Sequence, residues 1–219
     1  MNHSPAFTQD GTHLLPLLGE HMEIFVDHPS SSPVGLAIVA HPQPLLGGSA
    51  GHKVPRFIAQ TLRDAGWLSV RPNFRSVGQS TGTHDAGGAE TEDMLALIDT
   101  LRHSHPGLPL ALVGISFGAY VLARAARRLA DAGMPAWRTC LAAMPYGTVE
   151  GQRSYDTPHG IPDALVIHGE QDERVPLASI LEWGRADGQP VTVIPGASHL
   201  FNGRLPMLRA LVLKHLSLD

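Results

Sequence analysis

The segment LALVGISFGAY, residues 110–120, decides the fold of this chain. Its first four residues form a short apolar run typical of a buried strand, and the apolar positions from Ala119 onward recur at helical spacing. A Gly-x-Ser-x-Gly pattern, with Ser116 at its centre, stands between the two. A serine in such a strand-to-helix elbow occupies a strained turn, and Gly114 and Gly118 leave room for the close approach of the two backbones. The segment therefore predicts an α/β protein with Ser116 as a candidate nucleophile.

The same alternation of strand and helix signals extends on both sides of this segment. Short apolar runs rich in β-branched residues alternate with longer amphipathic stretches, which is the pattern of a mostly parallel sheet with helices on both faces. The expected strands are 13–18, 22–27, 35–41, 68–71, 110–113, 139–143, 164–168 and 191–194. The expected helices are 54–65, closed by Gly66 as a left-handed cap, 92–101, 119–130, 177–183 and 206–216. Because no repeat or linker interrupts the pattern, we expect one domain over residues 1–219.

The composition limits the possible classes of function. The chain has 219 residues, of which 43% are hydrophobic and 16% charged, as in globular proteins with a sizeable core. No apolar run is long enough to cross a bilayer, and residues 1–20 lack a secretory signal, so we expect a cytoplasmic protein without a membrane partner. The net charge of -4 and the scattered Lys and Arg residues predict no nucleic-acid partner. The oligomeric state cannot be derived from the sequence.

We expect neither a metal nor another cofactor. No grouped Cys, His and carboxylate residues predict a zinc site. The glycines around Gly48 are similar to those of a phosphate-binding loop, but Lys53 does not directly follow a glycine and Val54 stands where a hydroxyl is needed. Cys140 is the only cysteine and lies in an apolar run, so buried packing is the expected role of its thiol.

Two later loops contain candidate partners for the serine. A serine hydroxyl is a weak nucleophile near neutral pH, so it needs an adjacent base, and the base needs an orienting acid. The loop GEQDERVP, 169–176, follows the expected strand 164–168 and contains Asp172, with Glu170 and Glu173 as rivals; the loop PGASHLF, 195–201, follows the last strand and contains His199. Nucleophile, acid and histidine thus follow one another in the order found in α/β-hydrolases. The sequence does not show which of the three carboxylates faces the imidazole.

These motifs resemble the α/β-hydrolase superfamily, and in particular the small bacterial lidless serine hydrolases related to the dienelactone-hydrolase group. The resemblance runs from about the first strand to the last helix, and it also rests on HPQP at 41–44, GG at 47–48, RPNFR at 71–75 and Gly78. It implies an α/β-hydrolase fold with about eight strands and no cap domain. It also implies Ser116, Asp172 and His199 as the catalytic triad, and the backbone N–H groups of Gln43 and Phe117 as the oxyanion hole. The family usually has histidine where Gln43 stands and glycine where Ser76 stands.

The predicted function is hydrolysis of small soluble carboxylic esters through an acyl-enzyme on Ser116. Typical dienelactone enzymes use a cysteine nucleophile, so a serine favours carboxylic esters. The connection 144–163 is short and rich in Gly and Pro, which predicts an open site without a helical lid and without interfacial activation. A peptidase, thioesterase or lactonase would use the same triad, and a non-catalytic binding protein could keep the same fold.

Three further residues have two possible roles. Arg71 and Arg75 could hold an anionic substrate group, because a guanidinium matches the geometry of a carboxylate, although bracing of a loop is the simpler role. We expect His41 to shape the oxyanion loop rather than to transfer protons.

Overall fold

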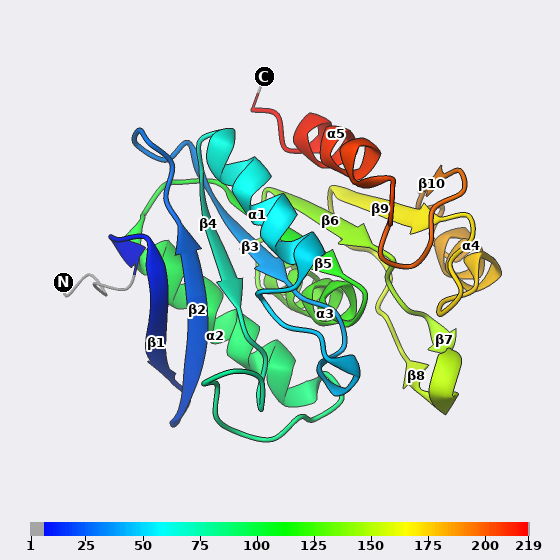
Figure 1. Cartoon of the computed structure of the whole chain (residues 1–219), viewed down its shortest axis with the longest axis horizontal. Coiled ribbons are helices and arrows are strands. Elements are labelled where there is room, and N and C mark those ends of the chain that lie inside the picture. Colours follow the sequence, from blue (N-terminus) through cyan, green and yellow to red (C-terminus); the bar gives the residue numbers. More distant parts are fainter. Residues whose placement is uncertain (1–6, 219) are drawn as a thin grey trace.

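An eight-stranded sheet forms the centre of the molecule (Figure 1). The computed structural model describes residues 7–218; the predicted domain also covers residues 1–6 and 219, which lie outside the described part. The order across the sheet is β1 (Gly11–Leu17), β2 (Glu20–Asp27), β4 (Trp67–Pro72), β3 (Gly35–Ala40), β5 (Leu110–Ile115), β6 (Arg138–Ala142), β9 (Ala164–Gly169) and β10 (Val191–Ile194). The pairs β1–β2 and β2–β4 are antiparallel and the other five are parallel. The predicted mostly parallel sheet of eight strands is confirmed.

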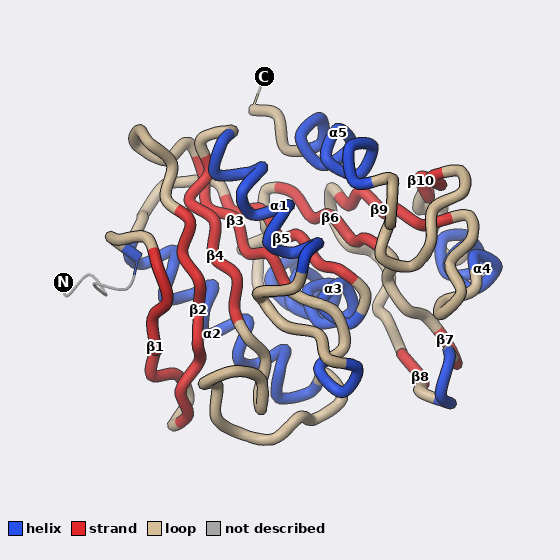
Figure 2. Tube along the Cα trace, in the orientation of Figure 1, coloured by secondary structure: helices blue, strands red, loops and turns tan. Residues whose placement is uncertain are grey.

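Helices cover both faces of this sheet (Figure 2). Strand β3 is buried along its whole length because Leu36 and Ile38 pack into one apolar cluster and Ala37 and Val39 into the other. Helices α1 (Lys53–Asp64) and α5 (Leu205–His215) pack into the cluster that contains Val39. Helices α2 (Gly88–Ser104), α3 (Phe117–Asp131) and α4 (Leu177–Arg185) pack into the opposite cluster. Among the described residues, no helix combines the length and apolarity that crossing a bilayer requires.

The helices begin and end close to their predicted limits, with one informative difference. Gly66 follows α1 with a φ of +91°, so the predicted left-handed position is confirmed. Helix α2 begins at Gly88, four residues before the predicted start at position 92. The added turn is polar and carries no apolar signal. It is held by the Glu90 carboxylate, which accepts the backbone N–H groups of Asp85 and Gly87 at 2.9 Å each.

The connection between β6 and β9 contains a small two-stranded unit that we did not expect from the sequence. Strands β7 (Gly147–Thr148) and β8 (Ser154–Tyr155) pair antiparallel around the short 3-10 helix η3 (Glu150–Gln152). A second 3-10 helix, η2 (Pro44–Leu46), follows β3. The 144–163 connection contains no α-helix, in agreement with the predicted absence of a helical cap. The hairpin and η2 thus border the sheet end that carries Ser116 (Figure 1).

Candidate active site

Ser116 lies between β5 and α3 in a backbone conformation that residues with a side chain rarely adopt. Its φ and ψ are 55° and -120°, which places a cost of about 1–3 kcal/mol on the turn. The turn is possible because a Cβ at Gly114 would lie 2.3 Å from Ala119 Cα, and a Cβ at Gly118 would lie 2.5 Å from the Ala40 carbonyl oxygen. Gly114 is therefore required by the close approach of β5 and α3, as predicted, whereas Gly118 is required by the approach of α3 to the end of β3.

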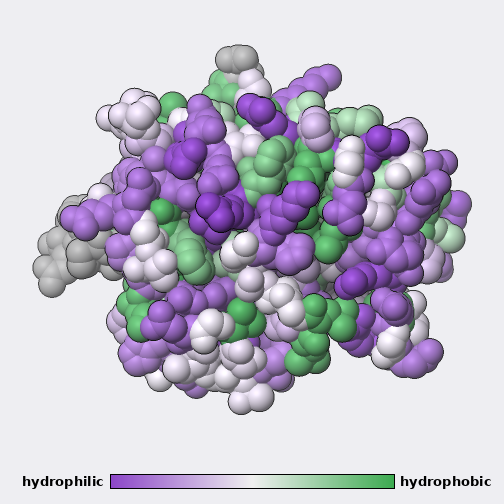
Figure 3. All heavy atoms as spheres, in the orientation of Figure 1, coloured by the Kyte–Doolittle hydropathy of each residue, from purple (hydrophilic) through white to green (hydrophobic). Residues whose placement is uncertain are grey.

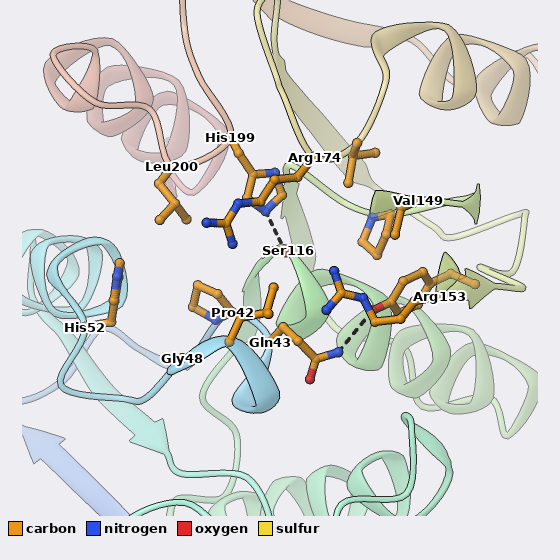
Figure 4. A pocket seen from close by; sticks show the side chains of 14 residues that line it. Pro42, Gln43, Gly48, His52, Ser116, Val149, Arg153, Arg174, His199 and Leu200 are labelled. Carbon is orange, nitrogen blue, oxygen red and sulfur yellow. Dashed lines mark hydrogen bonds between the residues drawn. The ribbon is translucent and has the colours of Figure 1, made fainter. Parts of the chain in front are cut away.

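The side chain of Ser116 belongs to a chain of hydrogen bonds that joins three loops, and Figure 4 shows its first bond, between Ser116 and His199. His199 Nε2 lies 2.8 Å from Ser116 Oγ, and His199 Nδ1 lies 2.8 Å from Asp172 Oδ2. The Asp172 side chain is fully buried and that of His199 is 3% exposed. Since Asp172 accepts a hydrogen bond from the Nδ1–H group, Nε2 is left with the lone pair that faces the serine hydroxyl. The arrangement can remove the serine proton.

Asp172 is fixed by its own loop. Its Oδ1 accepts the backbone N–H groups of Arg174 and Val175 at 2.9 and 2.8 Å. Burial alone would raise the pKa of Asp172, but the hydrogen bond and charge of His199, together with the two N–H groups, outweigh burial and lower this pKa. His168 Nε2 lies 3.4 Å from Asp172 Oδ2 and 3.0 Å from the Val175 carbonyl oxygen, and burial lowers the pKa of His168. Asp172 is therefore a carboxylate beside a neutral His168.

The two rival carboxylates contact the histidine loop through its backbone. Glu170 Oε2 accepts the N–H of Gly196 at 2.7 Å, and Glu173 Oε2 accepts the backbone N–H of His199 at 3.1 Å. Of the three acids in the loop, only Asp172 forms a described hydrogen bond with the His199 ring. In the structure, the carboxylate that faces the imidazole is therefore that of Asp172.

His41 holds the loop that follows β3. It is fully buried; its Nδ1 lies 2.7 Å from the Pro42 carbonyl oxygen, and its Nε2 accepts the backbone N–H of Phe74 at 3.0 Å. Burial lowers the pKa of His41 to about 3, although the Pro42 carbonyl acts in the opposite direction. A neutral ring with its proton on Nδ1 fits both contacts. His41 therefore shapes the loop, as expected from the sequence.

Gln43 lies in this loop, opposite the N-terminus of α3. Its backbone N–H forms no hydrogen bond among the described residues. Phe117 is the first residue of α3, so its N–H has no acceptor within the helix. The Gln43 side chain donates from Nε2 to the hydroxyl oxygen of Tyr155 at 3.1 Å, which links the loop to the β7–β8 hairpin (Figure 4). We did not predict this link from the sequence.

Gln43 and Ser76, the two residues that differ from the usual family pattern, each form a contact of their own. The Gln43 side chain occupies the position of the usual histidine and contacts the hairpin instead. Ser76 has a φ of +61°, in the left-handed region that favours glycine, and its Oγ donates to the Arg75 carbonyl at 2.6 Å. The usual glycine at position 76 is thus explained by the turn.

Arg71 and Arg75 brace the structure and do not line the pocket around Ser116. Arg71 Nε donates to Asp27 at 3.0 Å, and its Nη1 donates to the Ala50 carbonyl at 2.8 Å. Arg75 forms a bidentate pair with Asp93, with distances of 2.6 and 2.8 Å. The bracing role, the simpler of the two considered for these arginines, therefore agrees with their contacts.

Ser116 and His199 line a pocket of about 120 Å³. The hairpin and the acid loop contribute Arg153, Tyr155 and Arg174 to its lining, and we did not predict these from the sequence. Residues 7–218 hold no group of three His, Cys, Asp or Glu side chains that could bind a metal ion. Cys140 is buried away from the pocket lining, and burial raises the pKa of its thiol to about 12.

Comparison with known proteins agrees with this fold. No protein-family model matches the chain. A lidless α/β serine hydrolase from Xanthomonas campestris is 32% identical, with a TM-score of 0.83 over 95% of this chain and 94% of the other. An α/β serine hydrolase homologue from Coxiella burnetii is 31% identical, with a TM-score of 0.79 over 95% and 98%. An uncharacterised protein of Rickettsia prowazekii is 31% identical over 178 residues, which are 76% of this chain and 71% of that protein. The chain belongs to the α/β serine hydrolases.

Proposed function

We propose that this hydrolase cleaves small carboxylic esters, with Ser116 as nucleophile, His199 as general base and Asp172 as the acid that orients the imidazole. The observation that carries the proposal is the unbroken hydrogen-bond chain from Ser116 Oγ through both nitrogens of His199 to Asp172. A binding protein on this fold would not need to keep all three groups in register, nor the strained turn at Ser116.

The reaction follows from the positions of the lone pairs and protons. His199 Nε2 removes the Ser116 proton while Oγ attacks the ester carbonyl, and the carbonyl oxygen becomes an oxyanion. The N–H groups of Gln43 and Phe117 are free to donate to this oxyanion, and the N-terminus of α3 adds the positive end of its dipole. His199 then protonates the leaving alcohol. A water molecule, deprotonated by the same nitrogen, hydrolyses the acyl-enzyme and regenerates Ser116.

The surroundings of the pocket suit a small ester. Leu46 lines the pocket, and Leu45 and Leu46 of η2 are 67% and 50% exposed. Figure 3 shows the hydrophobic surface over η2. An alkyl group of an ester would bury part of this apolar surface.

Labelling with a fluorophosphonate probe tests the proposal. The activated Oγ of Ser116 should displace fluoride from the probe, and mass spectrometry should find the adduct on the Ser116 peptide alone. Ser116→Ala should remain unlabelled. Ser30→Ala, which changes an exposed serine between β2 and β3, should label like the wild type. Folded wild-type protein that stays unlabelled would favour a non-catalytic binding protein.

The backbone of Gln43 permits a sharp test of the oxyanion hole. With φ of -53° and ψ of 118°, Gln43 has backbone angles that proline adopts, so Gln43→Pro removes the N–H while residue 43 keeps its conformation. Gln43→Ala is the matched control, because both variants lose the side-chain bond to Tyr155 but only the proline variant loses the donor. We expect kcat of Gln43→Pro to lie about 10²- to 10³-fold below that of Gln43→Ala. Equal ester hydrolysis by the two folded variants would remove Gln43 from the oxyanion hole.

A further inference from the structure

The side chains that line the pocket around Ser116 carry positive charge without a matching negative charge. Of its fourteen lining residues, two are arginines and none is an aspartate or glutamate. Arg153 comes from the β7–β8 hairpin and Arg174 from the loop that carries Asp172. Figure 4 shows the two side chains reaching into the pocket, Arg174 from above and Arg153 from the right. The catalytic steps described above use neither of them.

Arg153 is held in place but keeps free donors. Its Nη2 donates to the Glu150 carbonyl at 2.9 Å, which fixes the side chain across η3. Its Nε is buried and has no partner in the part of the chain that the structure describes. Arg153 forms no described ion pair within residues 7–218. Its Nη1 forms no described hydrogen bond, so an anion in the pocket would find a guanidinium that is held in place and has a free terminal donor.

The positive charge of Arg174 is only weakly balanced by the neighbouring glutamates. Its Nε lies 4.0 Å from Glu150 Oε2 and 3.9 Å from Glu173 Oε1, both beyond hydrogen-bond distance. Both glutamate side chains are 60% exposed, so water screens them. In each pair Nε is the nearest nitrogen, and the two terminal nitrogens of Arg174 remain available on the side of the pocket.

We propose that Arg153 and Arg174 form an anion subsite, and that the physiological substrate is an ester that also carries a carboxylate. This inference rests on the proposed function and names its substrate class. With the ester carbonyl at Ser116, a carboxylate a few carbons away would accept charge-assisted hydrogen bonds from both guanidinium groups. Half-esters of short dicarboxylic acids combine an ester with a carboxylate a few carbons away. Their hydrolysis consumes one water and releases the alcohol and the dicarboxylate.

A matched pair of substrates tests the subsite. Monomethyl glutarate and methyl pentanoate have the same ester and chain, but the first ends in a carboxylate and the second in a methyl group. We expect wild-type kcat/KM, measured as methanol release, to be at least about tenfold higher for monomethyl glutarate. Arg153→Met and Arg174→Met should each lower the ratio of the two kcat/KM values by about tenfold or more, since each removes hydrogen bonds to a charged group. Arg209→Met, on the exposed face of α5, should leave the ratio unchanged.

Several outcomes separate this inference from the proposed function. A wild-type ratio near one, or an unchanged ratio in both pocket variants, would overturn the anion subsite while hydrolysis of methyl pentanoate still supported the esterase. Failure to cleave either ester, together with an unlabelled Ser116, would reject both. Because Arg153 also braces η3, Arg174→Met is the decisive variant if Arg153→Met is misfolded. Stronger protection of Ser116 from the probe by monomethyl glutarate than by methyl pentanoate would support the subsite independently of turnover.

Discussion

Replacing Ser116 by alanine is expected to lower kcat for ester hydrolysis by about 10⁴- to 10⁶-fold. The reason is that no other hydroxyl is described within hydrogen-bond distance of His199 Nε2, so no second nucleophile can take over. Residual turnover would come from water held in the pocket and from the free N–H groups. The measurement is steady-state hydrolysis of methyl pentanoate, with the fold checked by circular dichroism. A folded alanine variant that keeps more than a hundredth of wild-type kcat would remove Ser116 as nucleophile.

The strained turn at Ser116 adds a second readout to the same position. Alanine keeps a Cβ and therefore keeps the strain at a φ of 55°, whereas glycine tolerates positive φ without cost. Relief of about 1–3 kcal/mol of strain should exceed the cost of about 0.4–1 kcal/mol that glycine adds through the unfolded chain. Ser116→Gly should therefore be inactive yet unfold at a higher urea concentration than Ser116→Ala. A lower midpoint for the glycine variant would show that the turn is not strained.

Local sequence patterns predicted the sheet and helices well because burial leaves a direct mark on them. The runs around Val39 and Val113 are apolar at every position because both faces of those strands are covered. Helix α1 was visible because Ile58 and its neighbours one turn away are buried on one face. The first turn of α2 and the hairpin at Tyr155 were not visible, since a buried polar cap and two-residue strands have no periodicity.

Only those residues of the candidate site that directly follow a strand of the sheet could be predicted from the sequence. Ser116, Asp172 and His199 each follow a strand of the sheet, so their loops meet at the same edge. The link between Gln43 and Tyr155 spans 112 positions, and no local pattern encodes such a contact. The convergence of Arg153 and Arg174 likewise depends on how the hairpin packs against the acid loop. Contacts between distant loops come from tertiary packing, which a single sequence does not reveal.

Replacing Asp172 by asparagine is expected to lower kcat by about 10⁴-fold, although the substitution changes neither size nor shape. The hydrogen bonds of the loop determine the orientation of the new amide group. The N–H groups of Arg174 and Val175 both require an acceptor at the Oδ1 position, so the amide oxygen should stay there and the NH₂ group should replace Oδ2 beside His199 Nδ1. His168 Nε2, 3.4 Å from Oδ2, does not favour that orientation, but it contributes one distant contact against two short ones.

An NH₂ group at this position lies 2.8 Å from His199 Nδ1, nearer than the amide oxygen at 3.0 Å, so it should donate to Nδ1 and stabilise the tautomer with its proton on Nε2. That proton faces Ser116 Oγ, and His199 can no longer act as the base. Hydrolysis of methyl pentanoate measures the loss, and the ¹⁵N shifts of the His199 ring identify the tautomer. Glu170→Gln is the matched control: its amide oxygen can still accept the N–H of Gly196, so its loss should stay below about tenfold. If instead Glu170→Gln were the inactive variant and Asp172→Asn kept its activity and its Nδ1 proton, the orienting acid would have to be Glu170, because the buried carboxylate at position 172 would then contribute packing alone.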